Sequence, residues 1–210
     1  YAESFYRMFW NSFLQAVPTV AGQILVAAPA AFVMAKYRFR GKRVLFWIYL
    51  AVMLMPFQVL MVSEYLVLKN ISVINTHLAI ILPGIFTTFP VFILMKVFMN
   101  IEDEVMEAAR LDGAGAVTLL CRIGVPIGKG GIVSVAVLDF LECMNSIEAP
   151  LVFLRDKERW PLSLFFPAIS VYNAGEVFAA SVMIMIPAVL VFFLGDEYLE
   201  TGFKAFQVKG

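Results

Sequence analysis

The feature that most constrains this sequence is a series of five long apolar stretches. They cover residues 9–35, 44–68, 78–98, 132–153 and 178–195. A helix that crosses a lipid bilayer needs about 20 mostly apolar residues, because each residue adds about 1.5 Å and the hydrocarbon core is roughly 30 Å thick. Hydrophobic residues make up 61% of the chain and charged residues only 15%, which excludes an ordinary water-soluble domain. The sequence therefore predicts an all-α protein, a polytopic transmembrane helix bundle.

Prolines lie inside each of these stretches. Their positions are Pro18, Pro29, Pro56, Pro83, Pro90, Pro150 and Pro187. A proline breaks a helix in a soluble protein, but in a membrane bundle neighbouring helices and local water satisfy the carbonyl groups that it frees. We therefore expect five kinked spans rather than a larger number of shorter helices.

Basic residues are distributed unequally between the two sides of the predicted bundle. Of the 16 Lys and Arg residues, eleven fall on the side of the segments 36–43, 96–129 and 204–209, and five on the other side. Cytoplasmic loops carry an excess of Lys and Arg, so the first side is predicted to be cytoplasmic. The chain then starts outside and ends inside, which suggests that an earlier span is missing upstream. The basic segment 36–43 is interpreted as a topology anchor, and a lipid headgroup site is the alternative.

The predicted cytoplasmic segment 99–129 is long for a simple connection. Residues 101–111 are good helix formers without Gly or Pro. Asp112-Gly113 then predicts a stop, because glycine readily adopts the left-handed conformation that ends a helix. A second short helix is expected at 116–123, closed by Gly124 and Pro126. Two short helices joined by a tight turn would form a knob that presents a surface to another protein.

The first of these two helices is expected to have an apolar side and a wet side. The residues predicted for the apolar side are Val105, Ala108, Ala109 and Leu111. Those predicted to stay in water are Glu104, Glu107 and Arg110. The acidic residues near the start of the helix suit the positive end of its dipole.

Six positions of this segment match a known signature. Glu107-Ala108-Ala109 is followed at fixed spacing by Gly113, and then by Ile123 and Pro126. This pattern resembles the EAA loop of binding-protein-dependent ABC importers, with valine at position 125 where leucine is usual. The whole chain is similar to the permeases of sugar importers of the maltose and glycerol-phosphate type, with the first of the usual six spans absent.

The resemblance implies a membrane-spanning permease subunit of an ATP-driven carbohydrate importer in the bacterial cytoplasmic (inner) membrane. Such a subunit forms half of a translocation path for a sugar together with a second permease subunit. Its other partners are an ATP-binding subunit, expected in two copies, and an extracytoplasmic solute-binding protein. ATP and Mg²⁺ belong to the ATP-binding subunit, so this chain is expected to bind no cofactor and not to be an enzyme.

The resemblance also gives roles to the six matching residues. Glu107 would make a charged contact with the ATP-hydrolysing subunit, and Ala108 and Ala109 would allow a close approach. Gly113 would form the turn. The residues that would fix the second helix against the membrane core are Ile123 and Pro126. The alternative is that Glu107 is a solvated helix residue and Gly113 an ordinary helix end.

Ionisable residues at membrane depth usually face the protein interior or water. Asp139 and Glu142 lie about 10 and 15 Å into the fourth stretch, and on a helix they fall within about 60° of Ser146. They are interpreted as the polar wall of a translocation path that offers hydrogen bonds to sugar hydroxyls. The alternative is a polar contact between helices, or a shifted helix end. Glu64 and Gln58 in the second stretch are weaker candidates for the same path.

Two other functions would use the same two carboxylates. A secondary transporter would couple transport to protonation of Asp139 or Glu142, but no internal repeat is visible. An intramembrane enzyme would use them as acid and base, but no GxSxG or HExxH motif is present.

The remaining features give simpler expectations. His77 is the only histidine and has no cluster of metal ligands at a suitable spacing, so no metal site is expected. The zero net charge gives no electrostatic case for a nucleic-acid partner. The outer segment 154–177 is either a connector or, as the resemblance implies, a contact for the binding protein.

Overall fold

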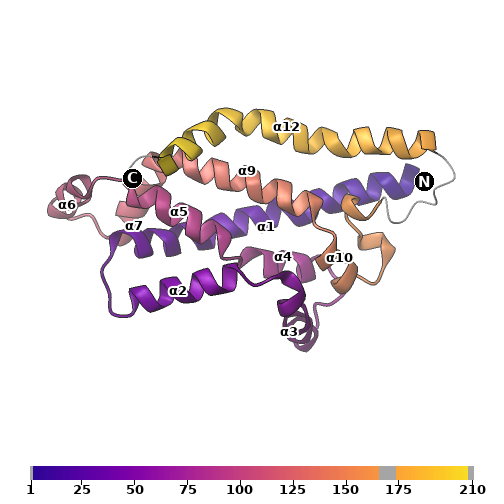
Figure 1. Ribbon diagram of the computed structural model, residues 1–210, viewed down its shortest axis with the longest axis horizontal. Coiled ribbons are helices and arrows are strands. Elements are labelled where there is room, and N and C mark those ends of the chain that lie inside the picture. The colour runs from indigo at the N-terminus through magenta and orange to yellow at the C-terminus, as the bar shows by residue number, and fades with distance from the viewer. Residues whose placement is uncertain (1, 166–173, 208–210) are drawn as a thin grey trace. The chain divides into compact units, whose positions relative to one another are not determined.

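The computed structural model describes residues 2–165 and 174–207, and throughout this part of the chain the regular secondary structure is helical (Figure 1). The prediction of an all-α protein is therefore confirmed. The α-helices are α1 (Ala2–Lys36), α2 (Lys42–Met53), α3 (Phe57–Asn70), α4 (Leu78–Ile85), α5 (Phe89–Met99), α6 (Asp103–Leu111), α7 (Ala116–Leu119), α8 (Val125–Ile127), α9 (Lys129–Asn145), α10 (Glu148–Phe153) and α12 (Ala174–Gln207).

Two segments are long and apolar enough to cross a membrane by themselves, Ser4–Lys36 and Leu78–Met99. Two further pairs of helices reach that length when each pair is counted as one broken span: α2 with α3, and Ala116–Ile127 with α9. The fifth predicted stretch lies within α12, which contains Pro187.

The predicted second and fourth spans are each divided into two helices. The helix is interrupted before Pro56, which has extended backbone angles of φ −67° and ψ 147°. The proline lacks an N–H and disfavours helical geometry in the residue before it. In the fourth stretch α9 ends at Asn145. Pro150 cannot donate to the carbonyl of Ser146, and the Ser163 hydroxyl donates to that carbonyl instead, at 2.5 Å.

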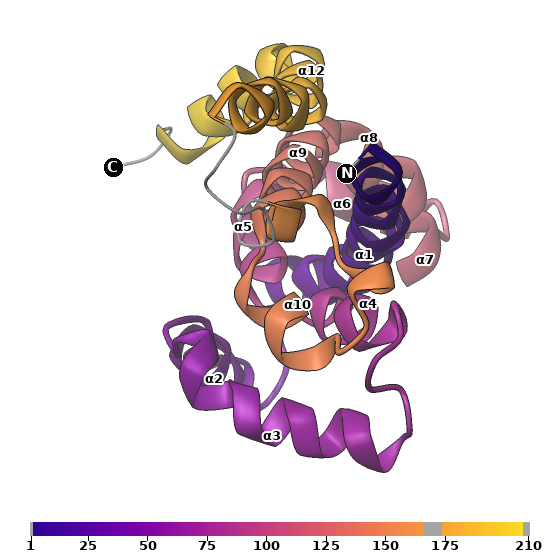
Figure 2. The same cartoon turned by 90° about the vertical axis from the view of Figure 1, so that its right-hand side faces the viewer.

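The chain forms two compact units. The first consists of residues 1–22, 55–85 and 138–194, and the second of residues 23–54, 86–137 and 195–210. Within the first unit α10 lies beside α4 and α3 (Figure 2), and Phe153 packs there on Leu68 and Ala79.

The core of the second unit joins the C-terminal half of α1 to α5 and to the helices of the segment 99–129. Phe32 and Phe98 pack edge to face, with ring centroids 5.5 Å apart. Met106 and Leu119 insert into the same cluster. Gly124 allows the second short helix to approach α1, because a Cβ at this position would lie 2.9 Å from the Phe32 ring. Figure 1 shows that α6 projects at the end of this unit where α1 and α5 finish.

Candidate functional site

The projecting helix α6 ends in a specific turn. Gly113 has a φ of +85°, and its N–H donates to the carbonyl of Arg110 at 3.0 Å. The next N–H, of Ala114, donates to the carbonyl of Ala109 at 3.0 Å. These two bonds form the Schellman arrangement that satisfies the last carbonyls of a helix. The predicted stop at Asp112-Gly113 is confirmed.

Three contacts hold α6 and the chain just before it against the end of α1 and the residue that follows α1. The Nζ of Lys36 lies 2.7 Å from the Asp103 carboxylate and also donates to the carbonyl of Ile101. The Arg110 guanidinium lies 5.1 Å from the centre of the Tyr37 ring. The hydrogen bond from Lys36 and its positive charge lower the pKa of Asp103. The Lys36 side chain is itself only 4% exposed, so this pair ties a buried cation to the first turn of α6.

The buried side of α6 differs from the predicted one. Met106 is 2% exposed and anchors the helix, whereas Leu111 is 89% exposed and Val105 and Ala108 are also exposed. The prediction of an apolar side containing these residues is therefore wrong. The pattern of apolar residues on so short a helix does not decide which of them faces the core. The contacts of Lys36 and Tyr37 with α6 set the rotation of the helix instead.

One surface of α6 and α7 is left uncovered. Glu107, Ala108 and Gly113 are exposed, as predicted for Glu107, while Ala109 is half-buried. Two large apolar side chains accompany them, Leu111 and Val117, the latter 74% exposed. We call the set Glu107, Ala108, Leu111, Gly113 and Val117 the coupling surface. A carboxylate beside exposed apolar side chains is typical of a surface that contacts a partner.

The second short helix continues beyond its predicted end. The chain passes from α7 through a π-helical turn, Leu120–Gly124, into α8, and only then bends by 78° into α9. The prediction that Gly124 and Pro126 end this short helix is therefore wrong. The wider π-helical turn accommodates Pro126, whose missing N–H is not needed at the start of a helix. Ile123 packs against the core of the second unit, and Pro126 is exposed.

The five residues predicted for a translocation path all belong to the first unit, and they differ in burial. Asp139 is 2% exposed, and its Oδ2 atom has no hydrogen-bond partner among the described residues. Glu142 is exposed. Ser146 lies beyond the end of α9, so the prediction that it shares a helix face with the two carboxylates is wrong. Glu64 is half-buried in α3. Gln58 is exposed.

Gln58 has a partner that the sequence did not single out. Its Nε2 atom donates to the Glu148 carboxylate at 2.6 Å, which joins α3 to α10. Among the described residues, no hydrogen bond or ion pair joins any two of the five predicted path residues to each other.

A buried polar stripe along α1 is not among the residues predicted from the sequence. Its members are Asn11, Gln15, Thr19 and Gln23. They recur every four residues, which is the spacing of one helix face, and this regularity is the signal that could have found them. Polar groups buried in a membrane helix need partners, so the stripe marks the side of α1 that faces protein.

The outer part of the stripe holds the outer segment in place. The Asn11 amide donates to the carbonyls of Glu158 at 2.7 Å and Trp160 at 3.1 Å. The Gln15 amide donates to the carbonyl of Arg159 at 3.0 Å and lies 3.1 Å from Nδ1 of His77. Partial burial, and then the charge of Arg159, lower the pKa of His77.

Asn75 fixes the start of the same segment. Its Oδ1 atom accepts the N–H groups of Arg155 at 2.9 Å and Asp156 at 3.0 Å, and its Nδ2 atom donates to the Asp156 carboxylate at 2.8 Å. Lys157 and Glu158 remain exposed. Residues 166–173 of the predicted outer segment lie outside the described residues. No group of three or more His, Cys, Asp or Glu side chains in residues 2–165 and 174–207 is placed to hold a metal ion.

Similar proteins are found among both curated sequences and solved structures. The arabinooligosaccharides transport system permease protein AraQ of Halalkalibacterium halodurans is 27% identical over 209 residues, which are 98% of this chain and 75% of AraQ. The diacetylchitobiose uptake system permease protein NgcG of Streptomyces coelicolor is 29% identical over 193 residues, 89% of this chain and 64% of NgcG. The sn-glycerol-3-phosphate transport system permease protein UgpE of Escherichia coli is 29% identical over 152 residues, 72% of this chain and 54% of UgpE.

The fold is shared with a bacterial ABC transporter involved in the import of the acidic polysaccharide alginate. The TM-score is 0.81 at 23% sequence identity, and the match covers 93% of this chain and 75% of the other. The family model of the binding-protein-dependent transport system inner membrane component matches residues 23–205, a range that includes α6 and the coupling surface. The chain therefore belongs to the family of inner membrane components of binding-protein-dependent transport systems.

Proposed function

We propose that this chain is the permease subunit of an ATP-driven carbohydrate importer and forms half of its translocation path with a second permease subunit. The observation that carries the proposal is the coupling surface, which is exposed on α6, the turn after it and α7, while Met106 and the Lys36–Asp103 pair anchor α6. AraQ is named for the transport of arabinooligosaccharides and NgcG for the uptake of diacetylchitobiose, which supports a carbohydrate as the substrate class.

The coupling surface would contact a separate ATP-binding subunit, which binds ATP and Mg²⁺. Glu107 would supply the charged contact, and Leu111 and Val117 would supply the apolar area. A displacement of α6 would reach α1 through the Lys36–Asp103 pair and the core through Met106. Ala109 and Ile123, which pack against the core of the second unit, would support this surface from within, and Pro126 would begin α8 after the π-helical turn.

The coupling proposal is tested by replacing Glu107 with alanine. Glu107→Ala is expected to reduce both co-purification of the ATP-binding subunit and ATP-driven uptake by tenfold or more, because losing one member of an interfacial charge pair costs about 2–5 kcal/mol. Glu102→Ala is the matched control, since Glu102 is also exposed and lies one residue before the start of α6, outside the coupling surface. Equal retention of the ATP-binding subunit by wild type and both variants would contradict the proposal.

The translocation path would use the polar groups of the first unit. Asp139 and Glu142 in α9 would offer acceptors to sugar hydroxyls, with Glu64, Gln58 and Ser146 as further contributors. Glu142→Leu is expected to reduce uptake while the assembled complex still purifies intact. Unchanged uptake would remove Glu142 from the path, and uptake that persists without ATP but requires a proton gradient would point to a secondary transporter instead.

The outer segment would contact a solute-binding protein. Asn75, Asn11 and Gln15 hold its backbone, so its exposed charges are presented on a fixed framework. Lys157→Glu is expected to weaken binding-protein docking severalfold in a pull-down, whereas Lys69→Glu, which reverses an exposed charge at the end of α3, should leave docking unchanged. Equal docking by both variants would refute this contact.

A further inference from the structure

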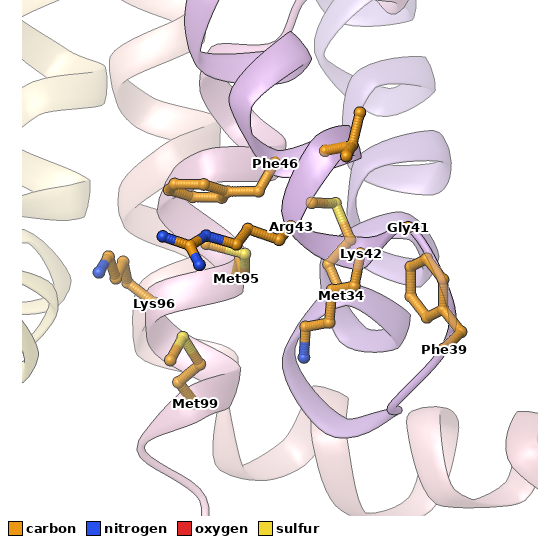
Figure 3. A pocket seen from close by; sticks show the side chains of 10 residues that line it. Met34, Phe39, Gly41, Lys42, Arg43, Phe46, Met95, Lys96 and Met99 are labelled. Atoms are coloured by element: carbon orange, nitrogen blue, oxygen red, sulfur yellow. The ribbon is translucent and has the colours of Figure 1, made fainter.

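A pocket of about 600 Å³ lies between the end of α1, the start of α2 and the end of α5 (Figure 3). Three of its lining side chains are basic: Lys42, Arg43 and Lys96. The others are apolar apart from Gly41, and no acidic residue of the described chain lines the pocket. The pocket belongs wholly to the second unit. The helix ends that line it lie at the end of this unit from which α6 projects (Figure 1).

The three cations come from two separate parts of the sequence and have no acidic partner among the described residues. Figure 3 shows Arg43 reaching from α2 toward Met95 and Lys96 of α5. Arg43 and Lys96 are exposed. The Nζ of Lys42 donates to the carbonyl of Tyr37 at 3.1 Å, and Lys96 lies 6.0 Å from the centre of the Phe92 ring, so neither charge is neutralised.

The meeting of three basic side chains from two helices at one pocket goes beyond what membrane topology requires. A topology anchor needs only basic residues in the connecting segment, and Arg38 and Arg40 satisfy that need while lining no part of the pocket. Charges of one sign that meet from two helices over a concave apolar surface instead match a ligand with an anionic head and a hydrocarbon body.

The apolar part of the pocket continues into an uncovered helix face. α2 has no buried residue, and Val44, which lines the pocket, is followed one turn later by Trp47 and Ile48, each more than half exposed. Met95 and Met99 form the opposite wall on α5. A hydrocarbon chain that leaves the pocket therefore meets an apolar track along α2.

We propose that this pocket binds one anionic glycerophospholipid of the inner leaflet. Arg43 and Lys96 hold the phosphate, Lys42 adds charge, and the acyl chains lie against Met95 and the exposed face of α2. Basic pockets between transmembrane helices on the cytoplasmic side favour anionic headgroups in this way. The excess of basic residues at this end places it at the inner leaflet.

The test measures binding of phosphatidylglycerol by native mass spectrometry of the full protein released from phosphatidylcholine nanodiscs with and without added phosphatidylglycerol. The double variant R43Q/K96Q should bind this lipid about 20- to 30-fold more weakly, because each basic residue near the surface contributes about 1 kcal/mol. The matched control R38Q/R40Q removes the same charge from the neighbouring segment and should change binding less than threefold. Thermal unfolding in phosphatidylcholine alone reports whether each variant is folded.

A second variant keeps the test decisive if R43Q/K96Q fails to fold. Met99→Asp places a carboxylate at the exposed rim of the pocket and should weaken phosphatidylglycerol binding by repulsion. Equal losses in the pocket and control variants would mean diffuse attraction rather than a site. Full competition by soluble glycerol phosphate would indicate a free phosphate ligand. Cross-linking of a Val44→Cys variant to a second permease subunit would indicate a protein interface, and each of these three results overturns the proposal.

Discussion

Replacing Met106 with alanine removes a contact that anchors α6 without changing any residue of the coupling surface. The Met106 side chain is 2% exposed and packs in the core of the second unit, while Glu107 next to it is exposed. The substitution removes three heavy atoms beyond Cβ. At about 0.8 kcal/mol for each buried methylene-sized group, the loss is about 2–3 kcal/mol, and an unfilled cavity would increase it.

This free energy is lost from the docked state of α6 because the helix is only nine residues long and cannot persist alone in water. We expect backbone amide exchange in residues 103–111 to become about 30- to 150-fold faster in Met106→Ala, measured by hydrogen–deuterium exchange of the protein in nanodiscs. Val105→Ala is the control, because Val105 is exposed on the same helix.

ATP-driven uptake should fall with the loss of anchoring although the residues of the coupling surface are unchanged. Exchange that rises less than threefold in residues 103–111 of Met106→Ala would refute the reasoning that this side chain carries the docking of α6. The same refutation follows if Val105→Ala and Met106→Ala accelerate exchange equally.

Three further predictions concern single residues. Gly113→Ala should destabilise the turn after α6 by about 1–2 kcal/mol, seen as faster amide exchange there, because φ is +85° while a Cβ would meet no other atom within 4 Å. The pKa of His77 is lowered from 6.5 in the folded protein, so the contribution of His77 to stability is complete above pH 6.5 and is lost as the pH falls through the folded pKa. Thermal unfolding at pH 7.5 and 5.5 should show this loss of stability, and the loss should be smaller in His77→Gln. Gln15→Leu should lower thermal stability by about 1–3 kcal/mol, because the carbonyl of Arg159 loses its donor, whereas Leu14→Ala at an exposed position should change it little.

The helical class and the turn at Gly113 could be predicted because each depends on local sequence. Five apolar stretches of sufficient length leave few alternatives to a helical membrane protein. The spacing of Glu107-Ala108-Ala109, Gly113, Ile123 and Pro126 was also visible, since it needs no knowledge of the packing. These features are set by composition, spacing and backbone conformation alone.

The rotation of α6 could not be predicted, because it depends on contacts with residues far away in the sequence. Met106 and Leu111 are similar in hydrophobicity, and only the packing against Phe32 and the pair formed by Lys36 with Asp103 decide which one is buried. The carbonyl of Ser146, which Pro150 leaves without a helical donor, likewise accepts a hydrogen bond from a residue 17 positions later. Long-range pairs of this kind leave no periodic trace in the sequence.

The π-helical turn at Leu120–Gly124 has a geometric consequence for the segment that carries the coupling surface. A π turn contains one residue more than the α-helical turn that it replaces. Moving that surplus residue out of the turn would rotate α7 against α8 by about 100° and shift it by about 1.5 Å along the axis, which is one residue of α-helix. Val117 would then face a different direction while Pro126 stayed in place, so the backbone holds a one-residue adjustment between the coupling surface and the start of α9.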